Sequence, residues 1–178
     1  MNPPGFSRIT PEFSRTTDVR FLPEAPLRLE ASAEECAALA RRFDLVAVKS
    51  LTAELALDKD KIAVTATGRL EAQIIQRCAV SAEDLAVTIS EPLAIRFIPA
   101  SSQRYAEAEV EIDAKDCDEV EFTGTTIDLG EELAQSLAVA IDPFLTGPQA
   151  EAARRKAGIV DVGSAGPFAA LAALKKRD

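Results

Sequence analysis

Hydrophobic and polar positions alternate with a period of two in three successive stretches of the chain, at residues 45–57, 62–78 and 85–97. This alternation predicts three half-buried β-strands, and the short polar connections between them favour an antiparallel meander. Lys49 interrupts the first stretch, Gly68 lies within the second, and Pro92 lies within the third. Glycine and proline inside a strand indicate a bulge, a bend or a strand edge, so a partial barrel curled at these points is left open as a second arrangement.

Two other stretches have the spacing of amphipathic helices. Ser32-Ala-Glu-Glu35 has the form of a capping box, and apolar residues follow it at helical spacing as far as Phe43, with Cys36 facing the core. Asp128 can cap a second helix, which Pro143 ends. Its apolar positions recur every four residues: Leu129, Leu133, Leu137 and Ile141. The predicted fold is therefore α+β, with two main helices covering the apolar face of the meander.

The ends of the chain have weaker patterns. Five prolines within the first thirty residues predict an extended segment, with a short edge strand at Val19 and Phe21. Two more strand candidates lie at residues 110–112 and 120–122. A length of 178 residues favours one domain, with an ordered core at about 17–145 and a flexible tail at 146–178 that includes a helical piece at 151–157.

Composition argues against several classes of function. Histidine is absent, which removes the usual general base and the commonest transition-metal ligand and argues against ordinary hydrolase chemistry, while catalysis by carboxylates or lysine stays open. We expect a non-enzymatic protein without a cofactor. The three cysteines lack a Cys-x-x-Cys pair, so neither a disulfide framework nor a metal site is expected. No uncharged apolar stretch approaches the roughly 20 residues of a membrane span, and we expect a cytoplasmic protein.

Charge is unevenly distributed along a chain whose formal net charge is −9. Residues 107–121 carry eight acids against Lys115 alone, whereas residues 151–178 carry six bases against three acids. The overall charge argues against indiscriminate binding of nucleic acid, but the basic tail could contact RNA. The acidic stretch could hold a cation or a basic protein, or could be a solvated loop.

Three separated segments together carry a family resemblance. They are Gln76-Arg-Cys78 at a strand end, Ile127-Asp-Leu129 opening the helix that leads to Asp142-Pro143, and the terminal Pro167-Phe-Ala-Ala-Leu-Ala-Ala-Leu-Lys-Lys176. In their order and spacing, these segments resemble the YceD family of factors needed for accumulation of large-subunit ribosomal RNA. The resemblance implies a role in ribosome assembly, and it supplies no catalytic residue.

The chain departs from that family at one position. Many members have a Cys-x-x-Cys pair that ends at the position of Cys78, but here Ile75 replaces the first cysteine. A metal or redox role for such a pair is therefore not expected in this chain. Because Cys78 lies on the apolar side of the alternating pattern, we interpret it as a buried structural thiol.

The candidate binding residues fall into three groups. The first group lies along one predicted strand, the second consists of basic residues of the tail, and the third is an apolar stripe on a short terminal helix. They are Arg69, Gln73, Gln76 and Arg77; Arg154, Arg155, Lys156, Lys175, Lys176 and Arg177; and Phe168, Leu171 and Leu174. Each group also has a plainer interpretation, as a solvated or helix-covered sheet face, as ordinary surface charge, or as a stripe docked on the protein itself.

Two functional hypotheses follow from these groups. In the first, the protein binds large-subunit ribosomal RNA or a pre-ribosomal particle through the basic residues and the polar sheet face. In the second, it is an acidic adaptor or chaperone for a basic ribosomal protein, held by the acidic stretch. No membrane partner is expected in either case.

Overall fold

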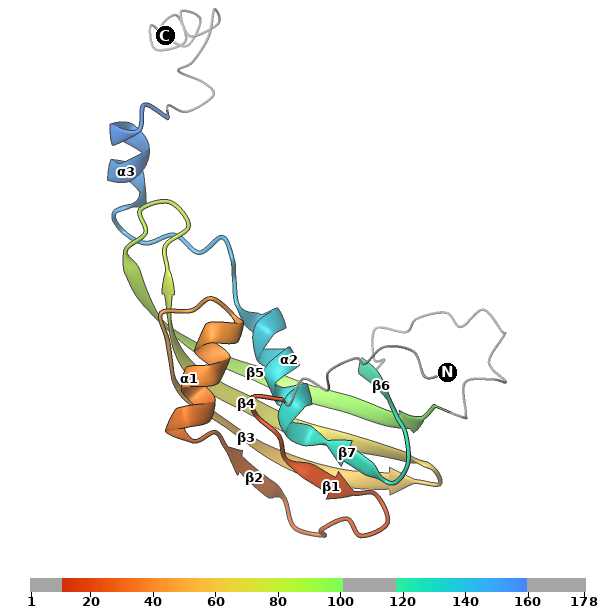
Figure 1. Ribbon diagram of the computed structural model, residues 1–178. Helices are drawn as coiled ribbons and strands as arrows, with labels where there is room; N and C mark the ends of the chain where they lie inside the picture. The colour runs from red at the N-terminus through yellow and green to blue at the C-terminus, as the bar shows by residue number, and fades with distance from the viewer. Residues whose placement is uncertain (1–10, 101–117, 160–178) are drawn as a thin grey trace, which may run out of the picture. The chain divides into compact units, whose positions relative to one another are not determined.

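The computed structural model describes residues 11–100 and 118–159 (Figure 1). Contacts divide the chain into two compact units, and we describe each by itself. The first comprises residues 1–75 and 86–141, and the second comprises residues 76–85 and 142–178. The sequence predicts one domain. Two long strands of the structure, β4 (Ala63–Arg77) and β5 (Asp84–Pro99), each contribute residues to both units.

The main sheet has five strands in the order β2-β3-β4-β5-β6. Their bounds are Leu27–Glu30 for β2, Ala47–Asp60 for β3, Ala63–Arg77 for β4, Asp84–Pro99 for β5 and Asp118–Phe122 for β6. β2 and β4 pair antiparallel with β3, whereas β6 pairs parallel with β5. The α+β prediction is confirmed, and the sheet is open because its edge strands β2 and β6 are at opposite ends of the strand order.

The structure differs from the predicted meander in two places. β6 lies beside β5 but runs parallel to it, with Ile95 opposite Asp118 and Pro99 opposite Phe122. The β3–β4 turn is also shorter than predicted. Residues 58–61 separate the two predicted strands, but β3 continues to Asp60, and Lys61 makes the turn with a positive φ of 53°. Ile62 therefore lies in the turn with 60% of its surface exposed, and it does not join the apolar strand face.

The three interruptions in the alternating pattern have different structural roles. At Lys49 the β3–β4 register shifts, and this bulge places both Val48 and Leu51 in the core. Gly68 causes no shift, but a Cβ there would lie 1.9 Å from the carbonyl oxygen of Glu54. Glycine thus allows the two backbones to approach closely. β5 continues through Pro92.

Two helices and a small two-stranded sheet cover one face of the main sheet (Figure 1). They are α1 (Ala33–Arg42), α2 (Leu129–Ala140), and the antiparallel pair β1 (Thr16–Asp18) and β7 (Thr126–Asp128). The helix predictions are confirmed: Ser32 and Glu35 form the capping box, and Asp128 caps α2. The largest fully buried side chains come from all of these layers: Phe13, Leu39, Leu51, Leu55, Val64, Leu70, Ile74, Phe97, Ile127, Leu129, Leu133 and Leu137.

The N-terminal segment enters this core earlier than the sequence predicts. Phe13 is fully buried, so the packed core begins before residue 17. The Asp128 carboxylate accepts hydrogen bonds from the Ser14 hydroxyl and the Arg15 backbone N–H, at 2.5 and 2.8 Å. The edge strand lies at Thr16–Asp18, whereas Phe21 is exposed.

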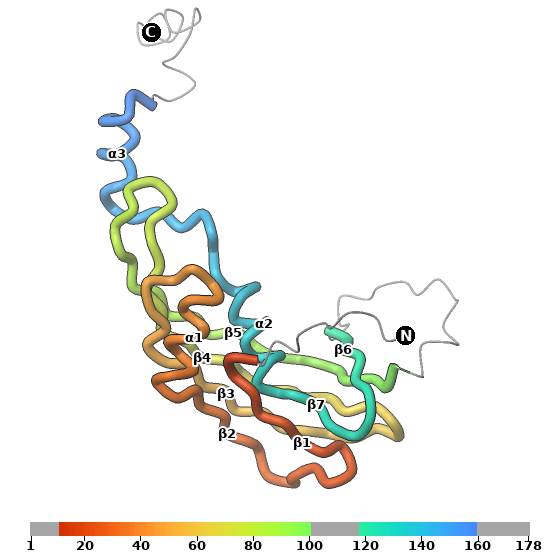
Figure 2. The backbone as a smooth tube through the Cα atoms, in the orientation of Figure 1, coloured from red at the N-terminus to blue at the C-terminus, as the bar shows by residue number. Residues whose placement is uncertain are grey.

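The second unit is built from a hairpin turn and the segment that follows α2 (Figure 2). The backbone N–H of Ala79 donates to the carbonyl of Leu145 at 2.9 Å, which joins the two segments. This segment leads to the short helix α3 (Ala150–Lys156), close to the helical piece predicted at 151–157.

Candidate functional site

The polar face of the sheet carries Arg69 and Gln73, as the alternation predicts. Both side chains are exposed, and no described helix of the first unit covers this face, so within the described residues it is a solvated sheet face. Arg69 donates to the Ser90 hydroxyl at 3.0 Å and lies opposite Glu54 in the strand register. Glu54 in turn lies opposite Arg28. Positive and negative side chains thus alternate across the face, so its arginines do not form a separate basic patch.

Two predicted residues of the same strand belong to the second unit and have different environments. Arg77 is exposed, as a binding residue would be. Gln76 is only 5% exposed, and its amide nitrogen donates to the carbonyl oxygen of Asp142 at 2.7 Å. Among the described residues the buried Oε1 atom of Gln76 has no hydrogen-bond partner. Gln76 therefore joins two segments of this unit, and its assignment to a binding surface is corrected.

The basic residues of α3 are partly engaged within their own helix. Arg154 forms an ion pair with Glu151, and the Arg155 side chain donates to the Glu151 carbonyl at 3.3 Å. Lys156 is exposed. The remaining predicted residues lie outside the described residues: Phe168, Leu171, Leu174, Lys175, Lys176 and Arg177.

Cys78 is a buried thiol, as the alternation predicts. Only 3% of the residue is exposed, and its sulfur accepts hydrogen bonds from the backbone N–H groups of Val80, Ser81 and Gly147 at 3.5, 3.3 and 3.3 Å. A hydrogen bond from the Ser81 side chain, together with these backbone donors, lowers the pKa of Cys78 to about 7. By contrast, burial raises the pKa of Cys36.

The described residues offer no metal centre. Within residues 11–100 and 118–159, no three His, Cys, Asp or Glu side chains are grouped so that they could hold an ion. Cys117 and most of the acids predicted to hold a cation lie outside these residues. The sulfur of Cys78 is surrounded by amide donors, an arrangement that stabilises a thiolate without a metal.

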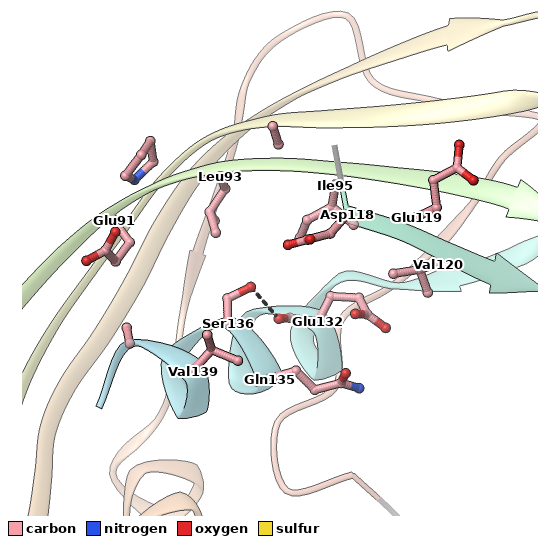
Figure 3. A pocket seen from close by; sticks show the side chains of 13 residues that line it. Glu91, Leu93, Ile95, Asp118, Glu119, Val120, Glu132, Gln135, Ser136 and Val139 are labelled. Carbon is pink, nitrogen blue, oxygen red and sulfur yellow. Dashed lines mark hydrogen bonds between the residues drawn. The ribbon is translucent and has the colours of Figure 1, made fainter. Parts of the chain in front are cut away.

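A groove of about 610 Å³ lies between α2 and the strands β5 and β6, and the sequence did not predict it (Figure 3). Leu93 and Ile95 of β5 and Val120 of β6 form its apolar floor, while Val139 stands on the α2 side with 89% of its surface exposed. Figure 3 shows these side chains on the two sides of the groove. Its volume is within the range of small-molecule and peptide-anchor sites.

Four acidic residues line this groove, and none of its described lining residues is a lysine or arginine. They are Glu91, Asp118, Glu119 and Glu132, but the Glu119 side chain pairs with Arg96 on the opposite face of the sheet, so the other three supply the carboxylates of the groove. Burial raises the pKa of Glu132, and the neighbouring charges of Glu131 and Asp128 raise it further. Glu132 is thus a carboxylate whose charged form lacks compensation.

Part of this site could have been found in the sequence. Asp118 and Glu119 belong to the acidic stretch, and Val139 lies outside the apolar stripe of α2. The signal that was missing is the position of α2 over the β5–β6 edge, which depends on tertiary contacts. Glu132 instead looks like an ordinary acid in the first turn of a helix.

In the part of the chain that the structure describes, no helix combines the length and the apolar character needed to cross a bilayer. No family model, curated protein or solved structure matches this chain.

Proposed function

We propose that this protein is a non-enzymatic factor that supports accumulation of large-subunit ribosomal RNA by binding a component of the assembling subunit. The three segments that resemble the YceD family carry this proposal. Two of them contain residues that connect distant parts of the chain or begin a helix. Gln76 bonds to Asp142, Cys78 bonds to Gly147, and Asp128 caps α2. The residues of these two segments thus have structural roles in this chain, while the third segment lies outside the described residues.

Direct binding of RNA is the first mode of action. The observation in its favour is the uncovered sheet face, where the exposed Arg69 and Gln73 can offer donors to phosphates or base edges. Glu54, opposite Arg69 in register, reduces the attraction of this face for a polyanion. Any contact made there would depend on a few hydrogen bonds and little on a broad positive potential.

Binding of a basic protein component is the second mode of action. The specific observation in its favour is the groove lined by carboxylates, because such a surface repels RNA and attracts cationic side chains. In this mode the protein would act as an adaptor or chaperone for a basic ribosomal protein.

The proposed function is tested by depletion. Cells that lack the protein should contain less large-subunit ribosomal RNA relative to small-subunit RNA, measured by gel quantification and by sucrose-gradient profiles at slow and fast growth. Expression of the wild-type chain should restore the ratio. An unchanged ratio at both growth rates would exclude the proposed process.

The mode of action is tested by mutation of the sheet face. If RNA binds there, Arg69→Ala should weaken binding and reduce the slope of log affinity against log salt by roughly 0.7 to 0.9 for one lost phosphate contact. Arg20→Ala is the matched control, because Arg20 is exposed and its described contacts are local: an ion pair with Asp18 and a cation–π contact with Phe21. Equal RNA affinity in wild type and Arg69→Ala would exclude this face as the RNA contact.

A further inference from the structure

The groove exists because β5 begins well before the point where β6 starts to pair with it. β6 pairs with β5 only from Ile95 to Pro99, so the inner face beside residues 91–94 extends beyond the start of β6. Asp118 and Val120 point to the same face as their partners Ile95 and Phe97. α2 lies across this face and leaves its exposed Val139 at the mouth of the groove (Figure 3).

The charges of the groove are poorly balanced within the described residues. Glu119 pairs with Arg96 at 3.1 Å, and both side chains are about half exposed. Within residues 11–100 and 118–159, Glu91, Asp118 and Glu132 form no ion pair and no side-chain hydrogen bond. A cation placed between these carboxylates would offset the burial that disfavours the charged form of Glu132.

We propose that this groove binds a basic peptide segment of a protein partner, with apolar side chains on its floor and lysine or arginine side chains at its carboxylates. This inference rests on the adaptor form of the proposed function. Among the apolar residues of the groove, Val139 is exposed and Val120 is half-buried, while Leu93 and Ile95 are buried. An apolar surface rimmed by charges of one sign is typical of sites that recognise amphipathic segments. Desolvated apolar anchors would supply affinity, and the carboxylates would supply orientation and a faster association.

Charge complementarity separates this occupant from two others. RNA carries the same sign of charge as the groove. The chain's own residues 107–116 carry five acids against Lys115, so they would add repulsion to the site. A basic segment with apolar anchors is the occupant that satisfies both the floor and the rim.

The test uses the full chain and three labelled 12-residue peptides, measured by fluorescence anisotropy at low and high salt. The first contains Lys, Leu and Ala, the second replaces Lys with Gln, and the third replaces Leu with Ser. We expect the first to bind, and each of the other two to bind more weakly by on the order of tenfold. Binding of all three with equal affinity, or of none, would overturn the proposal.

Variants of the protein locate the binding. Glu132→Gln with Asp118→Asn should weaken binding of the Lys–Leu–Ala peptide by on the order of tenfold, and Val139→Ser should weaken it at both salt concentrations. The matched controls are Glu54→Gln with Glu71→Gln on the opposite sheet face, and Ile62→Ser in an exposed turn. Circular dichroism and thermal melting verify that each variant is folded. Equal losses in the groove and control variants would overturn the assignment.

Two further arms examine other occupants. A single-stranded RNA of 12 nucleotides should not bind in a manner sensitive to the groove variants, and such sensitivity would overturn the proposal in favour of RNA. The full-length variant Lys175→Gln, Lys176→Gln, Arg177→Gln should bind the peptide as wild type does. If only that variant binds the peptide, the occupant is the chain's own basic end and the proposed partner is excluded.

These results are independent of the depletion experiment. A failure of peptide binding together with a loss of large-subunit RNA on depletion would remove the groove and retain the proposed process. Peptide binding that depends on the groove, with unchanged ribosomal RNA on depletion, would retain the groove and remove the process.

Discussion

The sulfur of Cys78 accepts a hydrogen bond from the backbone N–H of Gly147, which lies 69 residues further along the chain, at 3.3 Å. Val80 and Ser81 donate to the same sulfur from the adjacent turn. Gln76, two residues earlier, bonds to Asp142. The second unit is therefore held together by a thiol and an amide, each of which reaches from β4 or the turn after it to the segment that follows α2.

Replacing Cys78 with alanine should destabilise the protein, because three backbone donors would lose their common acceptor in a buried site. Cys36→Ala is the matched control, since Cys36 is similarly buried but has fewer backbone donors at its sulfur: its thiol contacts the carbonyl of Ala31 at 3.9 Å, and one backbone hydrogen bond joins it to Leu51. The measurement is the urea midpoint of each variant. A larger loss for Cys36→Ala than for Cys78→Ala would contradict the structural role of the thiol.

The same thiol should make stability depend on pH. Because its pKa is lowered from 9.0 to about 7 in the folded state, the unfolded chain binds more protons between these values. The free energy of unfolding should therefore rise as the pH increases from about 7 to 9, and this contribution should be lost as the pH falls through 7. The difference between wild type and Cys78→Ala, measured at pH 6, 7, 8 and 9, isolates this effect from other groups. A difference that stays constant with pH would contradict it.

Purified protein should contain no stoichiometric zinc. Ile75 stands where a second thiol would be needed, and three amide donors already surround the sulfur of Cys78. Elemental analysis after dialysis measures the metal, with a protein of known zinc content treated in parallel. One zinc per chain would contradict both the prediction and the assignment of Cys78 as a structural thiol.

The ion pair between Arg15 and Glu35 should contribute to acid stability. The guanidinium donates to both carboxylate oxygens, at 2.7 and 2.8 Å, and lowers the pKa of Glu35 from 4.5 to about 2. Its contribution should be complete above about pH 4.5 and should be lost as the pH falls to about 2. Since both side chains are partly solvated, we expect Arg15→Ala to cost about 1 to 2 kcal/mol at pH 7.

The control for this pair is Arg20→Ala, which removes a more exposed ion pair with Asp18 and should have a smaller effect at pH 7. Urea unfolding at pH 7 and pH 3 compares the variants. If Arg15→Ala lowered the free energy of unfolding more at pH 3 than at pH 7, the predicted loss of the ion pair in acid would be contradicted.

Gly68→Ala should be among the most damaging single substitutions in β4. The added Cβ would lie 1.9 Å from the Glu54 carbonyl oxygen, and relief of this clash requires movement of two paired backbones. We expect a loss of more than about 2 kcal/mol. Gly124→Ala is the control: its φ of 79° causes backbone strain, but no atom lies within 4 Å of the added Cβ. A smaller loss at Gly68 than at Gly124 would contradict the close approach.

Local patterns predicted most of the fold because each depends on neighbours in the chain. The period of two located β3, β4 and β5, and the caps at Ser32 and Asp128 located both helices. The direction of β6 could not be predicted in this way. A strand of five residues has the same alternation in either orientation, and its pairing is decided by contacts with distant residues.

The site was less predictable than the fold. Gln76 was grouped with Arg69, Gln73 and Arg77 along one predicted strand, although the alternation puts it between Ile74 and Cys78 on the buried face. The groove has no periodic signal, since its residues come from three separate elements. Arg69 lies where the alternation predicts, but its partner Glu54 becomes apparent only when the register of β3 and β4 is known.

The pairing of β1 with β7 has a consequence for synthesis on the ribosome. Thr16 to Asp18 find their strand partners only at residues 126–128, so β1 must wait for more than a hundred residues to be made. Meanwhile α1, the β3–β4 hairpin and the pairing of β2 with β3 can form from residues already outside the exit tunnel. The first strand to emerge is thus among the last to be fixed, and the nascent chain carries an unpaired edge until α2 is about to appear.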